Sequence, residues 1–252
     1  MKEKLYTIPL NDAVNADDEC PFCFVERNVE QDLLDYVLGP GASYMQADIR
    51  DITDRLGFCR THFKKMFDYG NTLGNGWILK THFMRLLGEM KAEFKKYSPA
   101  KSSFMGKFAK NTERVNTIGI WAQEKTDSCF ICKSFNETFD RYMDTFFYLY
   151  KEDSEFRKKI KESKGFCLKH FGDLCEASEN KLNDKEKRDF YPEMFELMEN
   201  NFARMVLEVD WLVDKFDYRY KDEDWKNSRD AVQRGMQKLK GGYPADGVYK
   251  GE

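Results

Sequence analysis

Apolar residues recur every three or four positions along most of the chain, which is the spacing of one face of an α-helix. The pattern is longest over residues 76–97 and over about 187–218. The apolar positions of the first stretch are Trp77, Phe83, Leu86, Leu87, Met90 and Phe94, and those of the second are Tyr191, Met194, Phe195, Met198, Phe202, Met205, Val209, Leu212 and Phe216. Helices of this length usually cross a whole bundle. We therefore expect two long helices.

Shorter stretches carry the same periodicity. It predicts helices over 26–38 and 133–149, each directly after a CxxC sequence, and over about 45–55 and 153–163. Further helices are expected within 100–126 and over about 225–239, and the Gly- and Pro-containing residues 241–252 are expected to form a loose tail. Val, Ile and Thr together number only 28 of 252 residues, which disfavours a sheet. The fold class is predicted to be all-α.

An internal repeat carries the candidate chemistry. The sequence CxxC, followed about 35 residues later by GFCxxH, occurs twice, with Cys129 lying 109 residues after Cys20 and Cys167 lying 108 residues after Cys59. Six of the seven cysteines and two of the three histidines belong to this repeat. These eight residues are Cys20, Cys23, Cys59, His62, Cys129, Cys132, Cys167 and His170.

Three thiolates and one imidazole form a common ligand set of structural zinc. A CxxC turn directs two sulfurs at one ion, and a Cys and a His three residues apart share one face of the first turn of a helix. The repeat thus predicts two zinc ions per chain, one for each Cys₃His set. The nearly equal loops within each half favour pairing of each CxxC with the CxxH of its own half, while pairing across the halves stays open.

The eight residues also admit other interpretations. An iron–sulfur cluster with Cys₃His ligation is an alternative, although such clusters usually have four cysteine ligands. A thioredoxin-like redox pair needs a βαβ context that the sequence lacks, and simple burial of cysteines does not explain the doubled spacing. Outside the repeat, Cys175 and His82 are interpreted as structural residues.

No sequence pattern indicates an enzyme. Ser-His-Asp, HExxH, P-loop and GxGxxG spacings are absent from the sequence, so no catalytic residue and no cofactor-binding residue is assigned. The net charge of −3 disfavours a dedicated nucleic-acid-binding protein. Basic stretches at 101–125 and 226–240 keep nucleic-acid binding as an alternative, although charged outer faces of helices explain them more simply.

The expected compartment is the cytoplasm, without membrane association. The first twenty residues contain no apolar run of signal-peptide length, and nowhere do 18 apolar residues follow one another. In a reducing compartment, seven cysteines indicate metal ligands or redox groups rather than disulfides.

The doubled CxxC…GFCxxH, together with the Lys-Phe-Asp-Tyr-Arg of 215–219 and the Asp-Ala-Val-Gln-Arg of 230–234, resembles an uncharacterised bacterial family known only as a domain of unknown function. The resemblance covers about residues 15–240 and implies a cytosolic bacterial protein without a known activity.

The expected organisation is a duplicated helical bundle in which each half is held by one metal site. It comprises a first repeat (1–99), a connecting segment (100–126), a second repeat (127–240) and the tail (241–252). The function that follows is a non-enzymatic, zinc-stabilised binding, scaffold or regulatory module with a protein partner that the sequence does not identify. A redox or iron–sulfur protein is the alternative.

Overall fold

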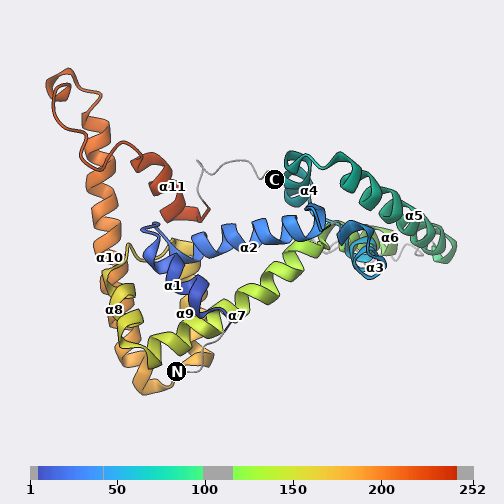
Figure 1. Ribbon diagram of the computed structural model, residues 1–252, viewed down its shortest axis with the longest axis horizontal. Coiled ribbons are helices and arrows are strands. Elements are labelled where there is room, and N and C mark those ends of the chain that lie inside the picture. The colour runs from blue at the N-terminus through green and yellow to red at the C-terminus, as the bar shows by residue number, and fades with distance from the viewer. Residues whose placement is uncertain (1–4, 42, 99–115, 243–252) are drawn as a thin grey trace, which may run out of the picture. The chain divides into compact units, whose positions relative to one another are not determined.

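The computed structural model describes residues 5–41, 43–98 and 116–242 (Figure 1). All regular secondary structure in these residues is helical, which confirms the predicted all-α class. The α-helices are α1 (Thr7–Asn15), α2 (Pro21–Leu38), α3 (Ala47–Leu56), α4 (Arg60–Tyr69), α5 (Thr72–Lys96), α6 (Thr117–Asp127), α7 (Phe130–Glu152), α8 (Ser154–Glu162), α9 (Leu168–Lys181), α10 (Asp184–Asp214) and α11 (Ala231–Lys240). Two short 3₁₀ helices, η1 (Ser43–Met45) and η3 (Tyr218–Tyr220), also occur.

The helices expected from periodicity are present, with shifted ends. Helices α2 and α7 begin earlier than expected, within the CxxC sequences themselves, where Pro21 occupies the first position of α2. A proline is well tolerated there because the first N–H groups of a helix have no partner within the helix. Helix α1 has no counterpart among the predictions. Of the connecting segment, α6 is the expected helix, while residues 99–115 and the tail from 243 lie outside the described residues.

The chain forms two compact units. Of the described residues, unit 1 comprises 5–30 and 135–242, and unit 2 comprises those within 31–134. These boundaries fall inside α2 and α7 rather than between the sequence repeats, so each unit contains helices from both repeats. This exchange could not be predicted from the sequence, because hydrophobic periodicity reports the face of a helix and not its partner.

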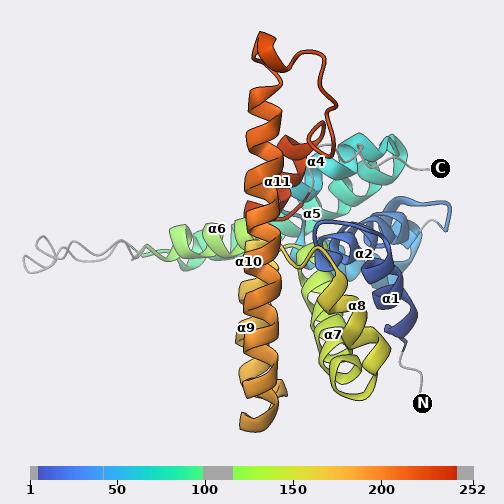
Figure 2. The same ribbon diagram turned by 90° about the vertical axis from the view of Figure 1, so that its left-hand side faces the viewer.

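An aromatic core fills unit 1. The side chain of Phe22 at the start of α2 is fully buried, and its ring centre lies 5.6 Å from that of Phe146 on α7 and 5.8 Å from that of Phe166. The apolar stripe predicted for α7 is buried here, including Phe139 and Phe147. Helix α11 lies beside α10 (Figures 1 and 2). Burial of these rings is the main source of stability for this unit.

Unit 2 has its own apolar core. Its buried members come from the end of α2, from the segment between α3 and α4, from α4 and α5, and from the start of α7 with the residue before it: Leu34, Val37, Leu38, Phe58, Met66, Tyr69, Ile78, Cys129, Phe130 and Ile131. Ile78 is the buried apolar side chain of α5, whereas Phe83, Leu87 and Phe94 of the predicted stripe are more than half exposed. The periodicity thus identified the helix but overstated how much of its apolar face is buried. Among the described residues, no helix is long and apolar enough to cross a membrane.

Candidate metal centres

Two groups of four residues bring their ligand atoms together. Site A consists of Cys20, Cys23, Cys167 and His170, and all its residues belong to unit 1. Site B consists of Cys59, His62, Cys129 and Cys132, and all its residues belong to unit 2. In each group the ligand atoms lie within 4.8 Å of one another.

The expected pairing within each half of the sequence is therefore wrong. Each site combines the CxxC of one repeat with the CxxH of the other. The expectation treated the 35 intervening residues as a flexible loop, for which equal lengths favour local closure. In the structure most of these residues are rigid helix, α2 and α3 in the first repeat and α7 and α8 in the second, so loop entropy does not decide the pairing.

The distances between ligand atoms fit a tetrahedral zinc ion. With Zn–S bonds of about 2.3 Å and Zn–N bonds of about 2.05 Å, a tetrahedron has S···S edges of about 3.8 Å and S···N edges of about 3.6 Å. In site B the Cys59 and Cys132 sulfurs are 3.8 Å apart, and the three sulfurs lie 3.2 to 3.4 Å from His62 Nδ1. In site A the three sulfurs lie 3.2 to 3.5 Å from His170 Nδ1.

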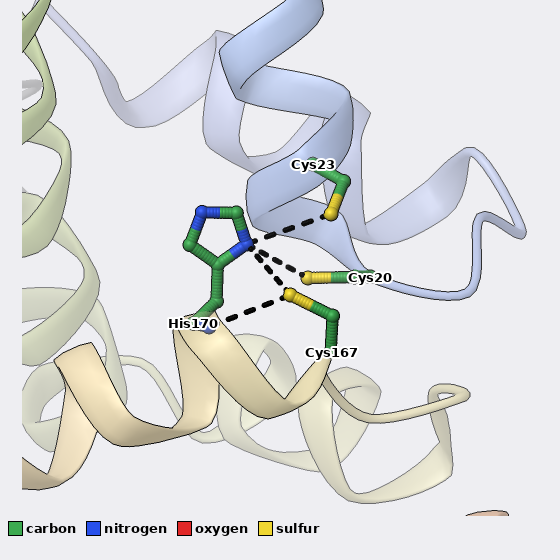
Figure 3. Close-up of side chains that lie close together, drawn as sticks. All are labelled: Cys20, Cys23, Cys167 and His170. Carbon is green, nitrogen blue, oxygen red and sulfur yellow. Dashed lines mark hydrogen bonds between the residues drawn. The ribbon is translucent and has the colours of Figure 1, made fainter. Parts of the chain in front are cut away.

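The local structure around site A directs all four side chains inward (Figure 3). Cys20 and Cys23 lie at the start of α2, and Cys167 is the N-cap of α9, with His170 in its first turn. The Cys167 sulfur also accepts a hydrogen bond from the His170 backbone N–H, over 3.4 Å. All four residues are completely buried. Donation from the backbone and the positive end of α9 both stabilise the thiolate that a metal requires.

Without a metal, the ligand atoms of site A hold protons that a metal cation would displace. Burial raises the pKa of the Cys20 thiol, and the neighbouring sulfurs raise it further. Hydrogen bonds from Cys20 and Cys23 hold the pKa of Cys167 well below its usual range. Burial opposes protonation of His170, but hydrogen bonds to Cys167, Cys23 and Glu26 raise its pKa to about 11. The group therefore retains protons near neutral pH, and a metal cation would displace them.

A second layer of polar groups surrounds His170. Its Nε2 atom, which faces away from the sulfurs, lies 3.0 Å from a carboxylate oxygen of Glu26, and Lys169 donates to the same oxygen over 2.8 Å. A carboxylate behind a metal-binding imidazole fixes the orientation and tautomer of the ring. The ring of Phe139 stacks on the imidazole at 5.4 Å. Glu26 was not among the residues expected from the sequence, although it lies only three residues after the CxxC.

Helix α11 closes site A from another side. The Lys238 ammonium is buried and donates to the Glu19 carbonyl oxygen over 2.5 Å and to the Lys164 carbonyl oxygen. Gly241, just after α11, has φ +77°, and a Cβ atom there would lie 3.5 Å from the Cys167 sulfur. The backbone of Gly241 thus packs against the sulfurs, where a glycine allows close approach.

Site B is built on the same plan but is less enclosed. Cys59 is the N-cap of α4, with His62 in its first turn, and Cys129 directly precedes α7, which contains Cys132. Cys129 and His62 are buried, whereas Cys59 and Cys132 are partly exposed. Burial alone would raise the pKa of Cys129, but hydrogen bonds from His62 and from backbone N–H groups lower it to about 6. Burial and the nearby Cys129 and Cys59 sulfurs raise the pKa of Cys132 to about 12.

The remaining candidates lie outside both groups. Cys175 is partly exposed and belongs to neither site. His82 lies in α5, and its Nδ1–H donates to the Asp54 carbonyl oxygen over 2.8 Å.

The fold and the two sites define an all-α protein with two Cys₃His groups that could hold metal ions. The chain belongs to a family of unknown function, DUF6062, whose model matches residues 1–246. This confirms the resemblance to a domain-of-unknown-function family. No curated protein and no solved structure matches the chain.

Proposed function

We propose that the protein is a zinc-stabilised, non-enzymatic binding or scaffold module that holds one zinc ion in site A and one in site B. The observation that carries this proposal is the convergence of three sulfurs and one Nδ1 atom in each group, at separations close to the edges of a zinc tetrahedron. Apparent free energies of structural zinc binding reach about 10–16 kcal/mol in small zinc fingers, so two such ions would contribute strongly to folding.

A structural role is supported by the completeness of the ligand sets. Catalytic zinc sites typically have three protein ligands and an open position for water or substrate. Here four protein ligands converge in each group, and in site A all four are fully buried. Because the ligands must be reduced thiolates, the same chemistry supports the proposal that the protein functions in a reducing compartment such as the cytoplasm.

The basic stretch at 226–240 gives little support to nucleic-acid binding. Arg234 pairs with Glu19 over 3.0 Å and also with Glu208, and Lys238 is buried against Glu19. These cations are neutralised within unit 1 and are not presented to phosphates. The proposed partner is accordingly a protein.

The test is elemental analysis of protein purified anaerobically, combined with an absorption spectrum. Two equivalents of zinc per chain and a colourless solution are expected. Less than about 1.5 equivalents of zinc would contradict the proposal. Iron with visible absorption would replace it with the iron–sulfur alternative.

A further inference from the structure

The two metal centres differ in the exposure of their sulfurs. The three sulfur-bearing side chains of site A are each 0% exposed. Of the three cysteines of site B only Cys129 is buried, at 4% exposure, while Cys59 and Cys132 are partly exposed. Oxidants reach metal-bound thiolates from solvent, so exposure is a main determinant of which thiolate reacts first.

The surroundings of site A protect its sulfurs further. Site A is covered by the Gly241 backbone after α11, and the buried Lys238 ammonium donates to the carbonyl oxygen of Glu19, the residue directly before Cys20. A neighbouring cation partly neutralises the excess negative charge of a zinc ion bound by three thiolates, which lowers the nucleophilicity of the sulfurs. Site A therefore combines physical cover with charge compensation.

The two partly exposed cysteines of site B are also neighbours. Their sulfur atoms are 3.8 Å apart, and they come from opposite sides of the ligand set, Cys59 from the N-cap of α4 and Cys132 from the first turn of α7. The S–S bond of a disulfide is about 2.05 Å long. The two sulfurs would therefore need to approach each other by roughly 1.8 Å once the metal no longer holds them apart.

We propose that site B is an oxidation-sensitive centre, in which a peroxide joins Cys59 and Cys132 in a disulfide and the zinc ion of site B is released while site A keeps its own. This inference rests on the proposed function, because it requires zinc in both sites. After the reaction only Cys129 and His62 remain as ligands, and two ligands hold zinc far more weakly than four.

The reaction is balanced by one hydrogen peroxide molecule. One thiolate of the pair attacks a peroxide oxygen, the O–O bond breaks, and the departing hydroxide takes a proton from solvent, which leaves a sulfenic acid and water. The second thiolate then attacks that sulfur, the S–O bond breaks, and the second hydroxide takes another proton. Two thiolates, one peroxide and two protons thus yield one disulfide and two waters, with two electrons passing from sulfur to oxygen.

The experiment uses the full chain carrying Cys175→Ser, which removes the one cysteine outside the two sites. Zinc content is measured first, and limiting hydrogen peroxide is then added in the presence of a chromogenic zinc chelator. A sample without peroxide serves as the control. The first equivalent of zinc should be released at least about tenfold faster than the second. Peptide mass spectrometry at that point should find a disulfide between Cys59 and Cys132.

Two variants test whether the zinc ion that is released first comes from site B. Cys167→Ser removes a ligand of site A and should leave the fast release unchanged, whereas Cys59→Ser should abolish it. Release of both zinc ions at one rate, or a first disulfide that contains Cys20, Cys23 or Cys167, would overturn the inference while leaving the zinc proposal intact. A first disulfide between Cys129 and Cys132 would overturn the assignment of the reacting pair. Absence of zinc from the starting protein would instead refute the proposed function.

Discussion

The ammonium group of Lys238 donates a hydrogen bond to the backbone carbonyl oxygen of Glu19, over 2.5 Å. The same ammonium bonds the Lys164 carbonyl oxygen, so it joins the segment before CxxC to the segment before GFC in site A. In site B the Ser128 hydroxyl donates to the Leu56 carbonyl oxygen over 2.6 Å at the equivalent place.

Site B has a second link that site A lacks. The Phe130 N–H donates to the Gly57 carbonyl oxygen over 2.9 Å, and the residue equivalent to Phe130 in the first repeat is Pro21, which has no N–H. The lysine from α11 thus substitutes for links that the second CxxC forms by itself. The stability of site A should therefore depend on α11.

Lys238→Met should lower the free energy of unfolding by about 3 kcal/mol, because two buried carbonyl oxygens and the Glu19 carboxylate lose a charged donor. Urea unfolding of the zinc-loaded protein measures this change. Zinc loss from site A to a chelator should accelerate, while loss from site B stays unchanged. Lys240→Met, at an exposed position of the same helix, is the matched control and should have little effect. An equal acceleration at both sites would contradict the link to site A.

Double variants test the exchange of ligands between repeats. Cys20→Ser with Cys167→Ser removes two ligands of the same site, so the protein should still bind one zinc ion. Cys20→Ser with Cys59→Ser affects both sites and should remove both ions, because each site keeps only three ligands. Zinc analysis after dialysis against a weak chelator distinguishes the two results. The opposite order of retention would restore pairing within each half.

Glu26→Ala should weaken zinc binding at site A by about 10- to 100-fold, the usual effect of removing a carboxylate behind a metal-binding histidine. Glu26→Gln keeps an acceptor for Nε2–H but loses the charge, so an intermediate effect is expected. Competition with a chelator of known affinity measures both variants, with exposed Glu152→Gln as the control. If Glu26→Ala leaves the affinity of site A unchanged, the carboxylate does not position His170.

The sequence was sufficient for the type of secondary structure and for the set of eight Cys and His residues, but not for their division between the two sites. Each α-helix of the described residues except α1 was expected, α4 and α9 from the CxxH that opens them, because apolar spacing and the placement of the motifs act locally. The eight Cys and His residues were found from the repeat alone, and the structure brings all eight into two groups.

The partners of these local elements could not be predicted in the same way. Pairing across the repeats depends on contacts such as Phe130 N–H to Gly57, between residues more than 70 positions apart, which no spacing rule encodes. Lys238 is a further example: within its charged stretch it resembles an exposed helix residue, yet it is 1% exposed. Only its tertiary partners reveal why a charge is buried there.

A carboxylate on α10, outside both ligand sets, predicts how unit 1 responds to acid. Glu193 on α10 accepts hydrogen bonds from the Tyr150 hydroxyl over 2.5 Å and from the Arg157 guanidinium over 3.0 Å. Burial alone would raise the pKa of Glu193, but these bonds hold it below its usual value. A depressed pKa in the folded state contributes stability above the unfolded pKa of about 4.3, and this contribution is lost as the pH falls through the folded pKa.

Glu193→Gln should therefore lower the free energy of unfolding by about 1–3 kcal/mol at pH 7, and the difference from the parent protein should shrink as the pH falls below about 4. Because acid also protonates the zinc ligands, the variant and the parent are compared at each pH by urea unfolding, so that metal loss affects both alike. Glu199→Gln, at an exposed position of α10, is the matched control and should show no such pH dependence. A constant difference between Glu193→Gln and the parent from pH 7 to pH 3.5 would show that the charge of Glu193 does not stabilise the fold.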